Sequence, residues 1–252
     1  MKPRVLAVIQ ARMGSSRLPG KVLMDLNGEP TILRIIDRLK KALTVDEIIV
    51  ATSLDESDNE LFELLHRKEI ECFRGSLEDV LSRFIGALAS SDAEIVIRIT
   101  ADCPLVMPKL VDQMVKDFLV SDLDYLSNTI TPTFPDGLDV EIFTKEALMR
   151  LNGLSLSSQE REHVTLGIRN RPEQFTLSNF VGKTDLSGLR WTVDYQEDFV
   201  FVTQVYSHFE KRESDFEYEE VLHLLEKAIL KPSTISASRR NEALLKPIEG
   251  HN

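Results

Sequence analysis

Short β-branched segments alternate with amphipathic segments in the first part of the chain. In the amphipathic segments, apolar residues recur at the spacing that places them on one face of a helix. Strands that alternate with helices form a largely parallel sheet, because each helix crosses the sheet to reach the next strand. The pattern predicts an α/β fold, with a mostly parallel sheet and helices on both faces. The predicted strands are residues 5–10, 48–51, 71–73 and 95–100, and the predicted helices lie at 32–39, 61–65 and 80–88, the last with Ser76 as its candidate N-cap.

The alternation breaks at residues 122–188, where shorter segments are separated by proline and glycine. This stretch predicts an insertion that forms an acceptor pocket or a dimer interface, without a core of its own. A strand at 189–193 and helices at 197–209 and 218–230 follow. We therefore predict one domain over residues 1–230 and a polar, loosely attached tail over 231–252.

Composition narrows the class of protein. A chain of 252 residues with 42% hydrophobic content is long enough to bury a sizeable core. It contains no apolar run near the roughly 18 residues that a membrane-spanning helix needs, and no signal-peptide pattern at its start. We expect a cytoplasmic protein that does not bind membranes. The two cysteines, Cys72 and Cys103, lack CxxC spacing, which favours reduced thiols over a disulfide or zinc ligands.

Charge is distributed unevenly along the chain. The net charge of -11 argues against a protein that binds nucleic acid polymers. The first 24 residues nevertheless contain five basic side chains and no acidic one. A local cationic segment on an acidic protein suggests a small polyanion, such as a nucleoside triphosphate, as the ligand.

The cations cluster in the sequence VIQARMGSSRLPGKVL, where the first predicted strand runs into a loop. Gly14 lets the backbone approach phosphate and Ser15 can donate a hydrogen bond to it, while Arg12, Arg17 and Lys21 offset its charge. An open α/β sheet binds its ligand at this edge. The loop lacks the GxxxxGK[ST] pattern of a Walker A motif, and a solvated basic loop is the alternative interpretation.

Two aspartates follow predicted strands. Asp102 ends RITAD and Asp194 ends RWTVD. Mg²⁺ on phosphates usually takes only one or two protein carboxylates, so this pair could hold the metal and align an in-line attack. Taken singly, each could equally be a helix N-cap or a turn residue.

Other polar residues fall in two groups, for which a plain structural role stays open. Gly75, Ser76 and Asp79 could face a nucleobase or only cap a helix. The second group is dense in the irregular stretch and suggests acceptor recognition, with Arg161 or His163 able to hold a carboxylate or phosphate. Its members are Asp136, Asp139, Glu141, Arg161, Glu162 and His163.

The segments IQARMGSSRLPGKVL, FRGSLEDVL, RITADCPL, FPDGLDVE, EREHVT and RWTVD occur in that order between residues 5 and 209. Together they resemble the spore coat polysaccharide biosynthesis protein SpsF family. That family lies within the cytidylyltransferase superfamily, which includes the CMP-Kdo and CMP-acylneuraminate synthetases. The PDGLDVE and EREHVT segments differ from the sialate and Kdo enzymes, so the acceptor stays open.

The resemblance implies a Rossmann-like nucleotidyltransferase, often a homodimer, that uses CTP and Mg²⁺. Such an enzyme transfers CMP to a sugar, with an acidic sugar favoured here, and releases pyrophosphate for surface polysaccharide or glycoconjugate synthesis. Asp102 and Asp194 would hold the metal and, with Arg12 and Lys21, form the catalytic group. The nucleotide-binding residues would be Gln10, Ala11, Arg12, Gly14, Ser15, Arg17, Lys21, Thr100 and Ala101, with Gly75, Ser76 and Asp79 at the base.

Two other functions fit the residues. A glycosyltransferase with a nucleotide-sugar donor would have a similar sheet and similar metal carboxylates. A nucleotide-binding subunit without activity would keep the loop, although the presence of both aspartates weighs against it.

Overall fold

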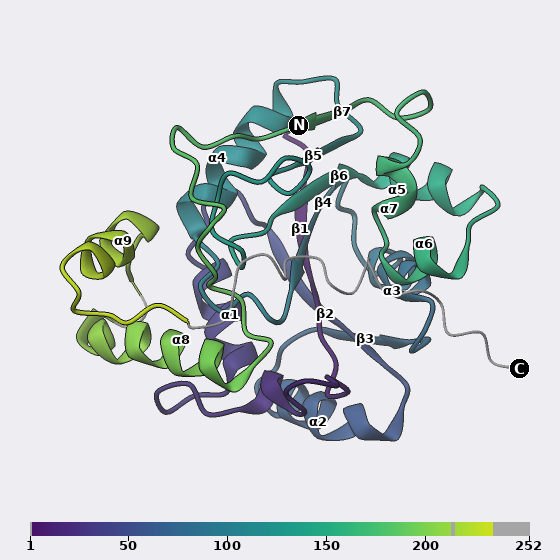
Figure 1. Ribbon diagram of the computed structural model, residues 1–252. Coiled ribbons are helices and arrows are strands. Elements are labelled where there is room, and N and C mark those ends of the chain that lie inside the picture. The colour runs from purple at the N-terminus through teal and green to yellow at the C-terminus, as the bar shows by residue number, and fades with distance from the viewer. Residues whose placement is uncertain (1, 213–214, 234–252) are drawn as a thin grey trace, which may run out of the picture.

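The computed structural model describes residues 2–212 and 215–233. Its centre is a seven-stranded sheet in the order β3-β2-β1-β4-β6-β5-β7 (Figure 1). The neighbours β3, β2, β1 and β4 are parallel, whereas β6 is antiparallel to both β4 and β5. The strands are β1 (Val5–Gln10), β2 (Glu47–Ser53), β3 (Cys72–Gly75), β4 (Ile95–Thr100), β5 (Tyr125–Ser127), β6 (Glu141–Thr144) and β7 (Leu177–Asn179).

Helices cover both faces of this sheet, as the sequence predicts (Figure 1). Strand β1 shows why, because its residues are apolar from Val5 to Ile9 and alternate between two separate hydrophobic clusters. One cluster includes α1 (Thr31–Leu39), α2 (Asn59–Arg67), α4 (Pro108–Leu119), α8 (Gln196–His208) and α9 (Tyr218–Glu226). The opposite face carries α3 (Val80–Leu88), α5 (Lys145–Asn152), α6 (Ser158–Glu162) and α7 (Leu166–Arg169). Short 3₁₀ helices are η1 (Lys21–Leu23), η2 (Glu56–Asp58) and η3 (Glu210–Arg212).

The predicted strand at 189–193 is wrong. This segment makes a single bridge, between Arg190 and Asp136. Its backbone is divided between two partners, because the Trp191 amide donates to the Asp136 carbonyl over 2.6 Å and the Val193 amide donates to the Asp102 carbonyl over 2.8 Å. Neither pairing extends along the segment, because the amide of Trp191 bonds to one neighbouring segment and the amide of Val193, two residues on, bonds to another.

Two further details differ from the sequence pattern. Residues 122–188 add β5, β6 and β7 to the central sheet, so the stretch is part of the sheet as well as of the site. Helix α3 begins at Val80 with Asp79, not Ser76, as its N-cap, since the Asp79 carboxylate accepts from the Ser82 amide over 2.9 Å. Most of the predicted tail, residues 234–252, lies outside the described residues.

A buried aspartate fixes the loop that follows β1. Asp58 is fully buried, and its carboxylate accepts from the Met13 amide over 2.6 Å and from the Ser53 amide over 3.1 Å. The loop is therefore attached to the end of β2, the neighbour of β1 in the sheet.

Among the described residues, no helix has both the length and the apolar character to span a bilayer.

Gly137 permits a close backbone contact between two segments of the site. Its φ is +107°, and a Cβ placed there would lie 2.4 Å from the Thr192 amide nitrogen. We expect Gly137→Ala to lower the free energy of unfolding by roughly 2–4 kcal/mol, from backbone strain and overlap together. Urea denaturation measures this change. Gly188→Ala is the control, because no atom lies within 4 Å of its added Cβ, and equal stability of the two variants would contradict the expectation.

Candidate active site

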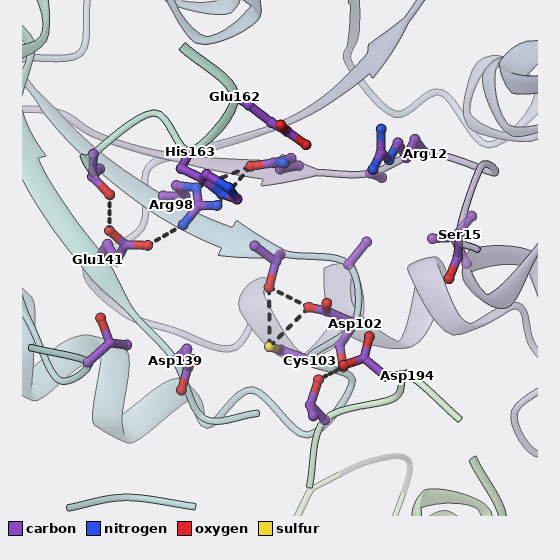
Figure 2. Close-up of a pocket in the computed structure, with 18 of the residues that line it drawn as sticks. Arg12, Ser15, Arg98, Asp102, Cys103, Asp139, Glu141, Glu162, His163 and Asp194 are labelled. Carbon is purple, nitrogen blue, oxygen red and sulfur yellow. Dashed lines mark hydrogen bonds and ion pairs between the residues drawn. The ribbon is translucent and has the colours of Figure 1, made fainter. Parts of the chain in front are cut away.

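A cleft of about 650 Å³ lies along the edge where β1 and β4 end. Figure 2 shows Arg12 and Ser15 toward one end and Arg98, Glu141 and His163 toward the other, with Asp102 and Asp194 between them in this view. The cleft brings together most of the residues that the sequence singles out. They are Gln10, Ala11, Arg12, Gly14, Ser15, Arg17, Lys21, Thr100, Ala101, Asp102, Asp136, Asp139, Glu141, Glu162, His163 and Asp194.

Lys21 links the two aspartates of the predicted metal site. Its ammonium lies 2.9 Å from Asp194 Oδ1 and 3.4 Å from Asp102 Oδ2, and donates to the Val193 carbonyl over 2.7 Å. Burial alone would lower the pKa of Lys21, but the attraction of Asp102 and Asp194 outweighs burial and raises it. Lys21 is therefore protonated at neutral pH and lies between the two carboxylates.

Asp102 is held by its neighbours in sequence and in space. Burial would raise the pKa of Asp102, but the Lys21 ammonium and the Thr100 hydroxyl more than offset it, and the pKa is lowered. The Asp102 carbonyl accepts from the Thr192 hydroxyl over 3.1 Å. These contacts keep an ionised carboxylate at the centre of the cleft.

Arg190 fixes the position of Asp194. Its guanidinium is only 2% exposed and contacts Asp136 at 2.9 Å, Asp198 at 3.0 Å and Asp194 Oδ2 at 3.1 Å. Asp198, at the start of α8, is fully buried and also accepts from the Asp194 amide over 3.0 Å. The sequence predicts that Asp136 binds the acceptor, but one of its carboxylate oxygens is paired with Arg190.

The carboxylate of Glu141, like that of Asp136, is already engaged by neighbouring side chains. Its carboxylate pairs with Arg98, accepts from the Thr165 hydroxyl, and accepts from the Tyr125 hydroxyl over 2.7 Å. Burial would raise the pKa of Glu141, but Arg98 and these hydroxyls more than compensate and lower it. We infer that Glu141 orients Arg98, which also donates to the side-chain oxygen of Gln10 over 3.0 and 3.1 Å.

The end of the cleft formed by α6 and α7 carries polar and cationic groups. Burial is the main cause that lowers the pKa of His163, so its imidazole is neutral near pH 7. Arg169 lines the same region, and among the described residues its guanidinium makes no hydrogen bond or ion pair. This end can accept hydrogen bonds and bind an anionic group.

Four predicted residues lie outside the lining of the cleft, namely Gly75, Ser76, Asp79 and Arg161. Asp79 caps α3 and forms an ion pair with Arg161 at 2.7 Å, so these two hold α3 against α6. Neighbouring Arg83 is 1% exposed, and its Nε and Nη1 are buried without hydrogen-bond partners. Burial, followed by repulsion from Arg12, lowers the pKa of Arg83 to about 10.

Sequence reasoning missed several residues that line the cleft. Arg98 lines the cleft, whereas Arg190 lies outside its lining and contacts the lining residues Asp136 and Asp194. Each interrupts an apolar run, and a charged residue in such a run is a signal that could have revealed them. The others carry no such signal: Thr129, Ser158, Gln159, Thr165, Arg169 and Thr192.

The described residues contain no cluster of three or more histidine, cysteine or carboxylate side chains that could hold a metal ion. A metal in the cleft would therefore rely on Asp102, Asp194 and oxygens of the substrate and water. An all-oxygen set with few carboxylates suits Mg²⁺ on phosphates. The donor chemistry of the site thus fits such an ion.

A mostly parallel sheet with a cationic glycine-containing loop and two carboxylates at one edge defines an α/β nucleotidyltransferase. The chain belongs to the cytidylyltransferase family, whose model matches residues 6–235. This match confirms the superfamily to which the sequence motifs pointed.

The chain is also similar to individual proteins of known sequence or structure. The chain is 32% identical over 228 residues to the spore coat polysaccharide biosynthesis protein SpsF of Bacillus subtilis, covering 88% of this chain and 93% of that protein. The structure of a cytidylyltransferase from Leptospira borgpetersenii has a TM-score of 0.84 at 30% identity, covering 93% of this chain and 99% of the other. A CMP-2-keto-3-deoxy-manno-octonic acid synthetase, solved as a complex with CTP, shares the fold at a TM-score of 0.63 and 18% identity, covering 81% and 99%.

The contribution of Arg190 can be compared with that of Arg17, because both guanidinium groups lie 3.1 Å from Asp194 Oδ2. Arg190→Met leaves buried carboxylates without a counter-charge, and we expect it to cost about 3–5 kcal/mol of unfolding free energy. Arg17 is 30% exposed, so Arg17→Met should cost less than about 1 kcal/mol. Guanidinium chloride denaturation measures both. A loss in Arg190→Met no larger than in Arg17→Met would show that the buried network does not hold the fold.

Proposed function

We propose that the protein is a Mg²⁺-dependent cytidylyltransferase that transfers CMP from CTP to a sugar, with an acidic sugar the expected acceptor. Pyrophosphate is the second product. The observation that carries the proposal is the meeting of Lys21 with Asp102 and Asp194 beside the loop after β1. The family and the CTP-bound structural neighbour support this chemistry. The name of the B. subtilis relative supports a role in polysaccharide biosynthesis.

The loop after β1 is suited to the triphosphate. Arg12 is exposed in the cleft and makes no ion pair with the described residues, so its charge is available to a ligand. Gly14 has open space around it, which lets phosphate oxygens approach the backbone. Fixed cations placed in advance around the phosphates stabilise the charge that develops on the pyrophosphate leaving group.

Asp102 and Asp194 would hold the metal, which when bound neutralises and aligns the phosphates. An acceptor hydroxyl attacks the α-phosphorus, a new oxygen–phosphorus bond forms, and the bond to the β-phosphate oxygen breaks. The hydroxyl proton passes to Asp194 or to water. Arg190 and Asp198 keep the Asp194 carboxylate in place while this happens.

The acceptor would occupy the end of the cleft lined by α6 and α7. Arg169 supplies a cation for a carboxylate or phosphate of the acceptor. Arg98 also lines the cleft and is held by its ion pair with Glu141. The neutral His163 can accept a hydrogen bond from a sugar hydroxyl. An acidic sugar satisfies both kinds of group.

The first test is calorimetric binding of CTP, UTP, ATP and GTP, each with and without Mg²⁺. We expect CTP to bind most tightly and its affinity to rise with Mg²⁺. Acidic sugars are then screened for pyrophosphate release. Binding of nucleotide-sugars without any free triphosphate would instead support a glycosyltransferase, and CTP binding without product in a single turnover would support a non-catalytic subunit.

Replacing either metal carboxylate separates binding from catalysis. We expect Asp102→Asn and Asp194→Asn to lower turnover by about 100-fold or more, because each removes a charge needed in the transition state. Their CTP affinity without metal should stay close to that of the wild type. Asp185→Asn is the control, because Asp185 is exposed and lies outside the cleft lining. Full activity in both cleft variants would rule out the two-carboxylate site.

We propose that Arg83, which is buried and lies outside the cleft lining, becomes accessible to the base when the nucleotide binds. It packs against Gly75, where a Cβ would lie 2.8 Å from the Arg83 side chain, and it has two buried donors without partners. Cytosine presents two adjacent acceptors, O2 and N3, whereas uracil carries a hydrogen at N3. A donor-rich arginine therefore favours cytosine.

Arg83→Met should lower the CTP-to-UTP affinity ratio by roughly 10-fold, the size of one good base contact. Stability should be kept, because the variant removes donors that lack partners in the free protein. Calorimetry gives the ratio and thermal unfolding checks the fold. The exposed Arg67→Met is the control. An unchanged ratio in Arg83→Met would exclude this arginine from base recognition.

A further inference from the structure

The gap between Asp102 and Asp194 already contains a cation. The Lys21 ammonium contacts three oxygens there, at 2.7 Å from Val193, 2.9 Å from Asp194 and 3.4 Å from Asp102. Its side chain is only 11% exposed. Lys21 thus occupies the position between the two carboxylates in which the proposed function places a divalent metal.

The remaining carboxylate oxygens are also engaged. Asp102 Oδ1 accepts from the Thr100 hydroxyl, and Asp194 Oδ2 faces both Arg17 and Arg190 at 3.1 Å. A divalent ion entering this gap alone would meet an ammonium and two guanidinium groups. Repulsion at such short range, in a partly buried site, opposes its binding.

Lys21, Arg17 and Arg190 differ in how easily they could move away from the two carboxylates. Arg190 is 2% exposed and also bound to Asp136 and Asp198, so it stays in place. Lys21 and Arg17 belong to the loop segment that lines the phosphate end of the cleft. Lys21 is the first residue of η1, and Gly20 before it has a left-handed φ of +71°. Phosphate oxygens in the cleft would offer Lys21 and Arg17 replacement partners for the carboxylates.

We propose that Lys21 is an internal counter-cation that the metal–nucleotide complex displaces. The site then takes a divalent ion together with a nucleoside triphosphate, and not as a free ion. Lys21, accompanied by Arg17, passes from the carboxylates to the phosphates as the carboxylates take the metal. This inference rests on the proposed function, because it needs a triphosphate at the loop.

Mn²⁺ is the probe, with its free concentration followed by electron paramagnetic resonance. The wild-type protein is titrated with Mn²⁺ alone and with CTP present in the absence of an acceptor. Because Mn²⁺ also binds free CTP, the protein-bound complex is obtained from matched titrations without protein. We expect Mn²⁺ to bind the free protein at least 10-fold more weakly than it binds the protein–CTP complex.

Lys21→Met removes the internal cation while keeping an apolar stem of similar length. It should raise the Mn²⁺ affinity of the free protein by at least 10-fold, and Asp102→Asn added to Lys21→Met should abolish the gain. Lys183→Met, at an exposed position outside the cleft lining, is the matched control and should leave the affinity unchanged.

The outcomes separate the two proposals. Equal Mn²⁺ affinity of the wild type with and without CTP overturns the exchange and leaves the cytidylyltransferase function standing. An unchanged Mn²⁺ affinity in folded Lys21→Met also overturns the exchange. Failure of the wild type to bind CTP with Mn²⁺ overturns both. The wild-type titrations decide the question even where Lys21→Met does not fold.

Discussion

The cleft at the edge of the sheet where β1 and β4 end depends on one buried guanidinium. Arg190 contacts Asp136, Asp194 and Asp198, which come from the segment before β6, the segment before α8, and α8 itself. A buried charge is tolerated only with partners that compensate for lost hydration. The three segments are therefore held together by the same requirement. Since Asp194 and Asp136 line the cleft and both pair with Arg190, the ion pairs of Arg190 determine where these two carboxylates lie.

The parallel half of the fold could be predicted because its signals are local. Strands 5–10 and 95–100 appear with the predicted bounds, since both are mostly apolar and largely buried. The cleft residues of the first loop and Asp102 then follow from a general rule, namely that the carboxyl ends of parallel strands share an edge. No long-range information was needed for these residues.

Other features depend on contacts between residues far apart in sequence. Asp194 lies beside Asp102 although it does not end a strand, because the Val193 amide and the Thr192 hydroxyl both donate to the Asp102 carbonyl. Glu141 lies in the cleft as predicted, yet its carboxylate is engaged by Arg98 and two hydroxyls. The sequence identified many of the polar residues of the site, but not which of them are free to contact a ligand and which position one another.

The reversed direction of β6 has a wider consequence. It lets the chain enter the sheet at the same edge that β1 and β4 reach as they end, as the pairing of Glu141 with Arg98 shows. One contiguous stretch, residues 129–169, supplies much of the cleft lining, whereas the rest comes from three separate segments, around residues 10–22, 98–103 and 192–194. In the proposed function the stretch from 129 to 169 binds the acceptor, so its sequence can change and admit new acceptors while the loop proposed to bind the triphosphate stays the same.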